Sequence, residues 1–223
     1  PRLHTQRMTK ALAAERVRRD IEVLARAGLD VDTFVAESMD SLNRAVSFDT
    51  VCLGTLDPST GLLTGTFKLG SLRDVDAHDH EWGLVEYGTS EPTAFLQMAA
   101  AGVSAAGVHA GTVGADRSAR FEEFMRPHFG FADELRALCR DERGNVWAGI
   151  ALFREGARAF FDSDDVSYLG SLAGSFALGM RAGLLTTLAD GGPTLQGPIV
   201  LIIDPSDEVS RMSLGAVERR AGL

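Results

Sequence analysis

Cysteine is scarce in this sequence. The chain of 223 residues contains only Cys52 and Cys139, and they form no Cys-x-x-Cys pair. Zinc sites and dithiol redox centres are commonly built on such pairs, so neither kind of site is indicated. Each cysteine lies within a strand-like segment, which predicts a reduced thiol inside a core.

Long apolar runs and a positive net charge are also absent. The arginine-rich opening predicts that there is no secretory signal. The longest weakly charged stretch, between Asp165 and Arg181, is shorter than the roughly 20 residues that a bilayer crossing needs. We therefore expect a cytoplasmic protein with no membrane contact. The formal net charge of −9 has the wrong sign for neutralising phosphates, so this chain is not expected to bind nucleic acid by itself.

Motifs of nucleophilic catalysis and nucleotide binding are missing as well. No Gly-x-Ser-x-Gly elbow, P-loop or dinucleotide fingerprint occurs, and the segment from Gly170 to Gly174 places its serine inside a helical pattern. The segment from Asp76 to Glu81 concentrates potential metal ligands around His78 and His80. No third ligand follows at a recognisable spacing, so we expect a solvated acidic loop rather than a metal site. The five histidines leave axial ligation of a haem open, and the cofactor stays undetermined.

The sequence does contain helical and strand-like patterns in alternation, which together predict an α+β chain. Apolar residues at helical spacing, and runs bounded by turn residues, mark the elements. The predicted elements are helices from Met8 to Ala27 and Asp32 to Ala45, strands from Asp49 to Asp57 and Leu62 to Leu69, and, between residues 70 and 130, short helices from Pro92 to Ala100 and Ser118 to Arg126.

The clearest pattern is a hairpin that leads into a helix. Residues from Phe131 to Arg140 roughly alternate between apolar and polar, and an unbroken apolar run from Val146 to Phe153 follows the turn at Asp141 to Asn145. A strand that is apolar on both faces belongs at the centre of a covered sheet. The segment from Phe160 to Asp165 then supplies an acidic N-cap, so a helix is expected to begin there.

The closing helix carries an apolar stripe from Val166 to Met180, with spacings of three and four residues. Its glycines Gly170, Gly174, Gly179 and Gly183 lie on neighbouring turns and would let another helix approach closely. Each glycine costs roughly 1 kcal/mol relative to alanine, which indicates tight packing. The pattern fits a dimeric bundle with the first helix, and it equally fits packing within one subunit.

The order of these pieces resembles the last hairpin and closing helix of GAF domains. The resemblance is carried by Asp133-Glu134-Leu135-Arg136, Val146-Trp147-Ala148-Gly149, Arg154, and Phe161 with the acidic residues after it. More narrowly, the chain is similar to the GAF-type sensor of actinobacterial LuxR-type helix-turn-helix transcription regulators. The resemblance extends more loosely over residues 30 to 188. The resemblance implies a GAF-like, PAS-related fold. In that fold a six-stranded antiparallel sheet has helices on both sides and a small-molecule pocket on one face.

On this basis the chain divides into four parts. We expect an N-terminal linker helix over residues 1–28 and a GAF-like sensor domain over 29–188, so that long helices lie at both ends of the fold. A linker is expected over 189–197, followed by the start of a truncated PAS-like segment over 198–223. We also expect that the natural protein extends beyond Leu223 to a DNA-binding helix-turn-helix.

The resemblance implies a sensory domain that binds a small molecule and dimerises within a transcription regulator, without catalysis of its own. Two alternatives stay open: a pure dimerisation module without a ligand, and a small GAF-type redox enzyme that depends on Cys52 and Cys139. Neither cysteine has the neighbouring histidine that bilin-carrying GAF domains use, and the Asn-Lys pair of cyclic-nucleotide-binding members is missing. The expected partners are a second copy of the chain and an unidentified small molecule, with DNA bound only through a helix-turn-helix that this chain lacks.

The candidate ligand-contacting residues are aromatic side chains suited to an apolar pocket, together with one arginine. They are Phe67, Trp82, Phe95, Arg120, Phe124 and Trp147. Arg120 is the candidate anchor for an acidic group of the ligand.

Overall fold

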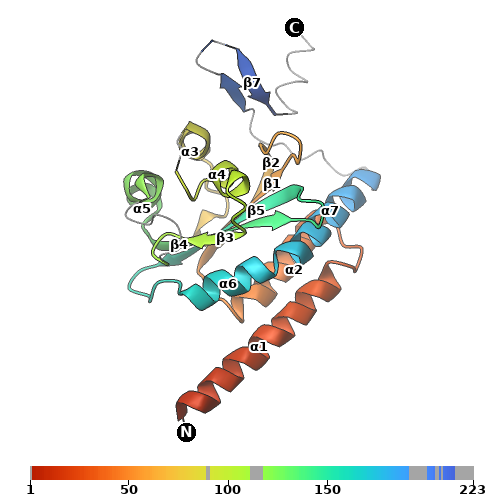
Figure 1. The fold of residues 1–223 in the computed structure, drawn as a ribbon, viewed down its shortest axis with the longest axis vertical. Coiled ribbons are helices and arrows are strands. Elements are labelled where there is room, and N and C mark those ends of the chain that lie inside the picture. The colour runs from red at the N-terminus through yellow and green to blue at the C-terminus, as the bar shows by residue number, and fades with distance from the viewer. Residues whose placement is uncertain are drawn as a thin grey trace.

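A computed structural model describes residues 2–88, 91–110, 118–190, 200–203, 206 and 208–213, with side chains from residue 11 onward. Its centre is a five-stranded antiparallel sheet with the strand order β2-β1-β5-β4-β3 (Figure 1). The strands are β1 (Thr50–Leu56), β2 (Leu63–Leu69), β3 (Ala105–Gly107), β4 (Phe131–Arg140) and β5 (Val146–Glu155). The predicted α+β class is confirmed. The predicted count of six strands is wrong for the described residues, in which the main sheet has five.

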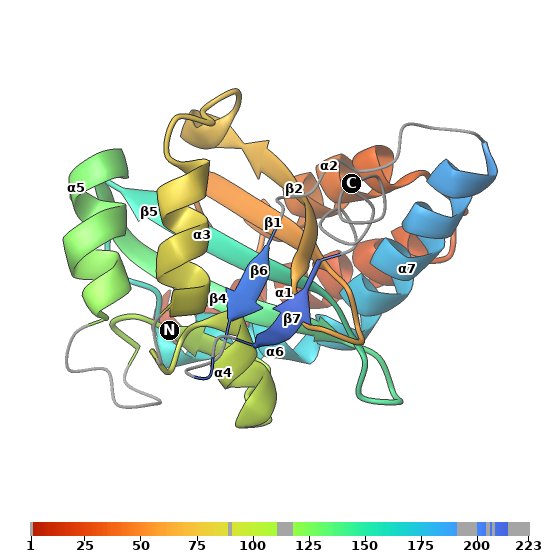
Figure 2. The ribbon, with the colours of Figure 1, turned by 90° about the horizontal axis from the view of Figure 1, so that it is seen from above.

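Helices cover both faces of the sheet. One face packs against α2 (Val31–Asn43), α6 (Ser163–Ser171) and α7 (Ala173–Ala189) in the largest apolar core, and α1 (Arg2–Leu24) joins this core by packing on α2 and α7. The other face carries α3 (Asp79–Gly88), α4 (Phe95–Ala100) and the π-helical segment η2 (Arg120–Met125), which continues into α5 (Arg126–Phe129). In the view from above, α3, α4 and α5 lie over the strands (Figure 2). A short 3₁₀ turn, η1 (Gly70–Leu72), follows β2.

The predicted hairpin forms the middle of this sheet. β5 pairs with β1 on one side and with β4 on the other, so its backbone is bonded along both edges. The register of β4 and β5 shifts where Cys139 pairs with Ala148 and Arg140 pairs with Val146, which leaves Trp147 as the extra residue of a β-bulge. A bulge turns its residue away from the regular alternation.

The helix predicted after the hairpin begins where expected. The Asp162 side chain accepts a hydrogen bond from the Asp165 backbone N–H at 2.8 Å, and the Asp165 side chain bonds back to Asp162, which completes a capping box. The closing helix is not continuous, because it breaks after Ser171 into α6 and α7, which are bent by 45°. Within the described residues, no single helix is long and apolar enough to cross a membrane, and only the bent pair α6 and α7 passes on length and composition together.

Two glycines of α7 bring this helix against α2. A Cβ atom added at Gly179 would lie 2.1 Å from the Phe34 ring, and one added at Gly183 would lie 2.8 Å from the Val31 Cα. Phe34 also packs edge-on against Phe176, with the ring centroids 6.2 Å apart. At these two positions the glycine pattern serves packing within one subunit.

The end of the chain forms a small separate sheet. Strands β6 (Leu201–Ile203) and β7 (Val209–Met212) pair antiparallel, and Arg211 donates a hydrogen bond at 2.7 Å to the Thr60 carbonyl in the turn after β1. Strands β6 and β7 thus form a hairpin within residues 198–223, where the start of a PAS-like segment is predicted. Residues 191–199 and 214–223, which include most of the predicted linker and the end of the predicted PAS-like segment, lie outside the described residues.

Alanine substitutions in α7 test the close contact with α2. In Gly179→Ala the added methyl group clashes with the Phe34 ring. This substitution is expected to lower the free energy of unfolding by about 1–3 kcal/mol. Gly174→Ala is the matched control, since an added Cβ there meets no atom within 4 Å, and it is expected to raise stability by up to about 1 kcal/mol. Urea unfolding of both variants measures the two effects. Equal effects in the two variants would contradict the packing described.

The turn between β4 and β5 gives a pH-dependent prediction. The side-chain hydrogen bond from Trp147, followed by bonds from Asn145, lowers the pKa of Asp141 from 3.8 to about 2. A lowered pKa in the folded state means that the stabilisation is complete above pH 3.8 and is lost as the pH falls through about 2. The difference in unfolding free energy between the wild type and Asp141→Ala is therefore expected to shrink over this window. A difference that stays constant across the window would rule out this role of Asp141.

Candidate functional site

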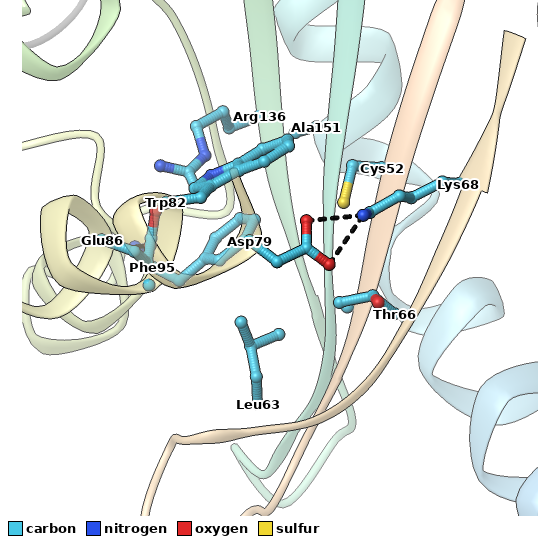
Figure 3. Close-up of a pocket in the computed structure, with 12 residues that line it drawn as sticks. Cys52, Leu63, Thr66, Lys68, Asp79, Trp82, Glu86, Phe95, Arg136 and Ala151 are labelled. Carbon is cyan, nitrogen blue, oxygen red and sulfur yellow. Dashed lines mark hydrogen bonds and ion pairs between the residues drawn. The ribbon is translucent and has the colours of Figure 1, made fainter. Parts of the chain in front are cut away.

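A pocket of about 260 Å³ lies between α3 and the sheet (Figure 3). Six elements of the chain surround it, namely β1, β2, α3, α4, β4 and β5. The lining residues are Cys52, Gly54, Leu63, Thr66, Lys68, Asp79, Trp82, Gly83, Glu86, Phe95, Arg136 and Ala151.

The floor of the pocket is made of small residues of the sheet. Cys52 of β1 lies opposite Ala151 of β5, and Gly54 lies opposite Gly149, all on the face turned toward α3. A Cβ atom added at Gly149 would come within 2.5 Å of the Phe95 ring. The missing side chain at Gly149 therefore lets Phe95 lie on the sheet and close one end of the pocket.

The wall opposite the floor is one face of α3. Asp79, Trp82, Gly83 and Glu86 follow the spacing of one helix face, and all four line the pocket. A Cβ atom added at Gly83 would meet no atom within 4 Å. The inner face of α3 therefore borders open space rather than packing directly on the strands.

Lys68 of β2 holds the beginning of α3 against the sheet. Its Nζ donates hydrogen bonds to both carboxylate oxygens of Asp79 at 2.6 and 2.8 Å, to Asp76 at 2.8 Å and to the Val75 carbonyl at 2.7 Å. Burial by itself lowers the pKa of Lys68, but the bonds to Asp76 and Asp79 outweigh burial and the pKa is raised. Lys68 is therefore a fully bonded cation in the pocket wall.

A second ion pair lies across the pocket, between Arg136 of β4 and Glu86 of α3. Arg136 donates to Glu86 at 2.8 Å and to the Thr93 carbonyl at 2.8 Å, and its guanidinium lies 3.7 Å from the centre of the Phe95 ring. The other Glu86 oxygen accepts a hydrogen bond from the Phe95 backbone N–H at 2.7 Å. All of these groups are buried, so this pair fixes the end of α3 and the aromatic wall together.

The charges continue behind the pocket. Glu134 pairs with the guanidinium of Arg120, and one of its oxygens lies 3.7 Å from the Nε of Arg136. Burial alone lowers the pKa of Arg120, but the charge and hydrogen bonds of Glu134, together with the charges of Glu86 and Glu91, outweigh burial and the pKa is raised. Glu91 lies 3.7 Å from Arg120 on its other side. Negative and positive side chains thus alternate in space, in the order Glu86, Arg136, Glu134, Arg120 and Glu91.

Two of the six candidate residues from the sequence line this pocket, Trp82 and Phe95. Phe124 lies on the same side of the sheet in a neighbouring aromatic cluster. Phe67 and the bulged Trp147 pack against the opposite core. Arg120 is fully buried against Glu134 and does not line the pocket.

Sequence reasoning missed the charged residues of the pocket, above all Lys68 and Arg136. Both lie in strands, on the side that alternates away from the main core. A charged residue in an otherwise apolar strand is the signal that would have identified them, because charged groups in covered sheets need partners. The acidic segment around Asp79 was expected to be solvated; Asp76 and Asp79 are exposed to 80% and 45%, and both also bind Lys68.

The two cysteines lie on opposite faces of the sheet. Cys52 lines the pocket, whereas Cys139 belongs to the core under α2 and α7. Burial raises the pKa of the Cys52 thiol to about 12. A disulfide between the two would have to pass through the sheet, so they form no dithiol pair. In the described part of the chain, no group of three or more metal-ligating side chains is found.

The chain matches no protein-family model and no curated protein. Among solved structures, it is similar to the nlh2 GAF domain of A. aeolicus in an inactive state, with 11% identity, a TM-score of 0.47, and coverage of 77% of this chain and 98% of that one. A Synechocystis GAF domain in its photoproduct state is 14% identical, with a TM-score of 0.46 and coverage of 74% of this chain and 100% of that one. The GAF domain of a phosphoenolpyruvate-protein phosphotransferase from Coxiella burnetii is 15% identical, with a TM-score of 0.44 and coverage of 81% of this chain and 98% of that one.

The buried pair behind the pocket yields a prediction about Arg120. Arg120→Met leaves the Glu134 carboxylate buried without its main partner and is expected to lower the free energy of unfolding by about 3–5 kcal/mol. The double variant Arg120→Met/Glu134→Leu is expected to be less destabilised than either single variant. Denaturant unfolding measures all three.

Arg126→Met is the control, because its pair with Glu122 is partly exposed and is expected to contribute less than about 1 kcal/mol. A stable Arg120→Met variant that no longer binds a ligand would instead support Arg120 as a ligand anchor.

Proposed function

We propose that this chain is a GAF-type sensory domain that binds a small molecule in the pocket under α3 and passes this signal to a regulator. The observation that carries the proposal is the pocket itself, which combines a floor of small residues, two aromatic walls and two ion pairs. Ligand sites typically combine apolar walls with a few placed polar groups. No covalent chemistry is assigned to the site.

The sequence resemblance supports the same proposal. It implies an antiparallel sheet covered on both sides, with a pocket on one face, and the chain has these features with five strands in the main sheet of the described residues. The regulator that we propose is a cytoplasmic LuxR-type transcription factor, in which a helix-turn-helix outside this chain contacts DNA.

The redox alternative has less support, because it needs cooperating cysteines. Cys52 and Cys139 are separated by the sheet, and burial raises the pKa of both thiols. A thiol rather than a thiolate is a poor nucleophile. The alternative of a dimerisation module without a ligand requires a collapsed pocket, which the space beside Gly83 disfavours.

The proposed sensor acts as a homodimer through α7 and α1. Leu178, Leu185 and Leu188 follow each other at seven and three residues along α7 and are 40%, 57% and 61% exposed. Leu12 of α1 is 59% exposed. Apolar side chains at such spacing are typical of a helix that pairs with another helix.

Native mass spectrometry of the chain after exposure to a cell extract of small molecules tests ligand binding and subunit number together. We expect a dimer that carries added mass. Ala151→Leu fills the floor of the pocket and is expected to remove the added mass while the dimer persists. Ala157→Leu, at an exposed position after β5, is the matched control and should keep it.

Retention of the bound molecule by Ala151→Leu would place the ligand elsewhere. A dimer that takes up no molecule from any extract would support the dimerisation module, and a monomer would contradict the role given to α7.

A further inference from the structure

The pocket contains one cation whose partners can leave it and one whose partners cannot. Lys68 and Arg136 are the cations among the lining residues, and their side chains are 8% and 2% exposed. The partners of Arg136 are the buried Glu86 and a backbone carbonyl. The carboxylate partners of Lys68 are Asp79 and Asp76, whose side chains are 45% and 80% exposed. These carboxylates can turn into water.

This asymmetry decides which ligand charge the pocket accepts. A cationic ligand would have to take Asp79 or Glu86, and so leave Lys68 or Arg136 buried with fewer partners, which is costly. An anionic ligand that binds Lys68 displaces Asp79 instead. Because Asp79 is nearly half exposed, its carboxylate is hydrated after it leaves.

The remaining lining favours a ring next to the anionic group. Trp82 and Phe95 form the walls, and the floor of Cys52, Gly54 and Ala151 has no bulky side chain. In Figure 3 the Asp79 carboxylate reaches Lys68 across the space in front of these residues. The volume of about 260 Å³ equals that of roughly nine waters in the liquid, which limits the ligand to a small molecule.

The helix that carries Asp79 is held by polar contacts at both ends and by the ring of Trp82, which packs on Phe129 and Phe153. Glu86 is the one buried residue of α3, and Leu84 on its outer side is 60% exposed. The far end of α3 is tied by Glu86 to Arg136 and by the Tyr87 hydroxyl, which accepts a hydrogen bond from the Leu63 backbone N–H at 2.7 Å. The ion pair with Lys68 ties the near end to the sheet. Release of Asp79 would therefore remove the ion pair between the near end of α3 and the sheet, while the far end stays fixed.

We propose that the pocket binds a small aromatic carboxylate whose carboxylate replaces Asp79 on Lys68 and thereby releases the beginning of α3. Asp79 is then an internal competitor that occupies the anion position when no ligand is bound. The ligand exchanges one ion pair for another, and no bond is formed or broken covalently. This inference rests on the proposed function and adds the ligand class, its anchor and the element that responds.

The binding test uses the fluorescence of Trp82. The chain has two tryptophans, so Trp147→Phe leaves Trp82 in the pocket as the single reporter. This variant is titrated with benzoate and phenylacetate, and in parallel with benzamide and phenylacetamide, which keep the ring and lose the charge. We expect saturable changes with the carboxylates and affinities at least roughly tenfold weaker for the amides, since a charge-assisted hydrogen bond is lost.

Two substitutions in the same background assign the roles of Lys68 and Asp79. Lys68→Met is expected to abolish the preference for carboxylates over amides. Asp79→Asn removes the competing charge and is expected to strengthen carboxylate binding several-fold. Asp164→Asn is the matched control, because Asp164 also lies in the first turn of a helix, is exposed and lies far from the pocket lining, and it should change neither affinity.

Hydrogen exchange of the α3 amides tests the release of the helix. Phenylacetate, and separately Lys68→Met, should both accelerate exchange in the first turns of α3, while exchange in β4 and β5 stays unchanged. Unchanged exchange in β4 and β5 also shows that the variant is folded.

Equal binding of carboxylates and amides, carboxylate binding that survives Lys68→Met, or no response to either carboxylate at millimolar concentration would each overturn this inference. None of these results removes the proposed function, which fails only if native mass spectrometry finds no bound molecule from any extract. The two failures are therefore distinguishable.

Discussion

The pocket depends on the lack of side-chain bulk on one face of the sheet. At the centre of that face lie Gly54, Gly149 and Ala151, whereas Leu53, Ile150 and Leu152 on the other face are large. These large side chains fill the space between the sheet and helices α2 and α7. On the other side α3 stands away from the strands, and the space beneath it becomes a cavity. One face of the sheet thus forms the largest apolar core, and the other face forms the floor of the pocket.

On the face with the pocket, buried charged residues connect the sheet to the helices. Arg136 and Glu86 connect the sheet to α3, and Arg120 and Glu134 form the buried pair behind them. A buried charge requires a partner with good geometry, so these pairs specify where α3 and η2 lie. The pair of Lys68 with the partly exposed Asp79 can be exchanged for contacts with a ligand, which apolar core contacts cannot. This difference makes α3 the element best suited to respond to a bound molecule.

The sequence predicted the hairpin of β4 and β5 and the helix cap at Asp162, because both are encoded within a few neighbouring residues. It placed Trp82 and Phe95 among the ligand-contacting candidates, and both line the pocket. Trp147 illustrates what local patterns miss. It is the extra residue of a bulge whose position depends on how β4 pairs with β5, and its side chain packs on the opposite core. The break between α6 and α7 was likewise not visible in a continuous apolar stripe.

The sequence by itself determined the α+β class, the main strands and the absence of familiar catalytic motifs, since periodicity and turn residues act over short distances. Only the tertiary structure decided which charged residues meet. Lys68 and Asp79 come from different elements, as do Arg136 and Glu86, and nothing in their sequence spacing pairs them. Strand order and helix placement bring these groups within hydrogen-bonding distance. Burial of Lys68, Arg136 and Glu86 then requires that each of them has a partner, because an unpaired charge in that environment is too costly to keep.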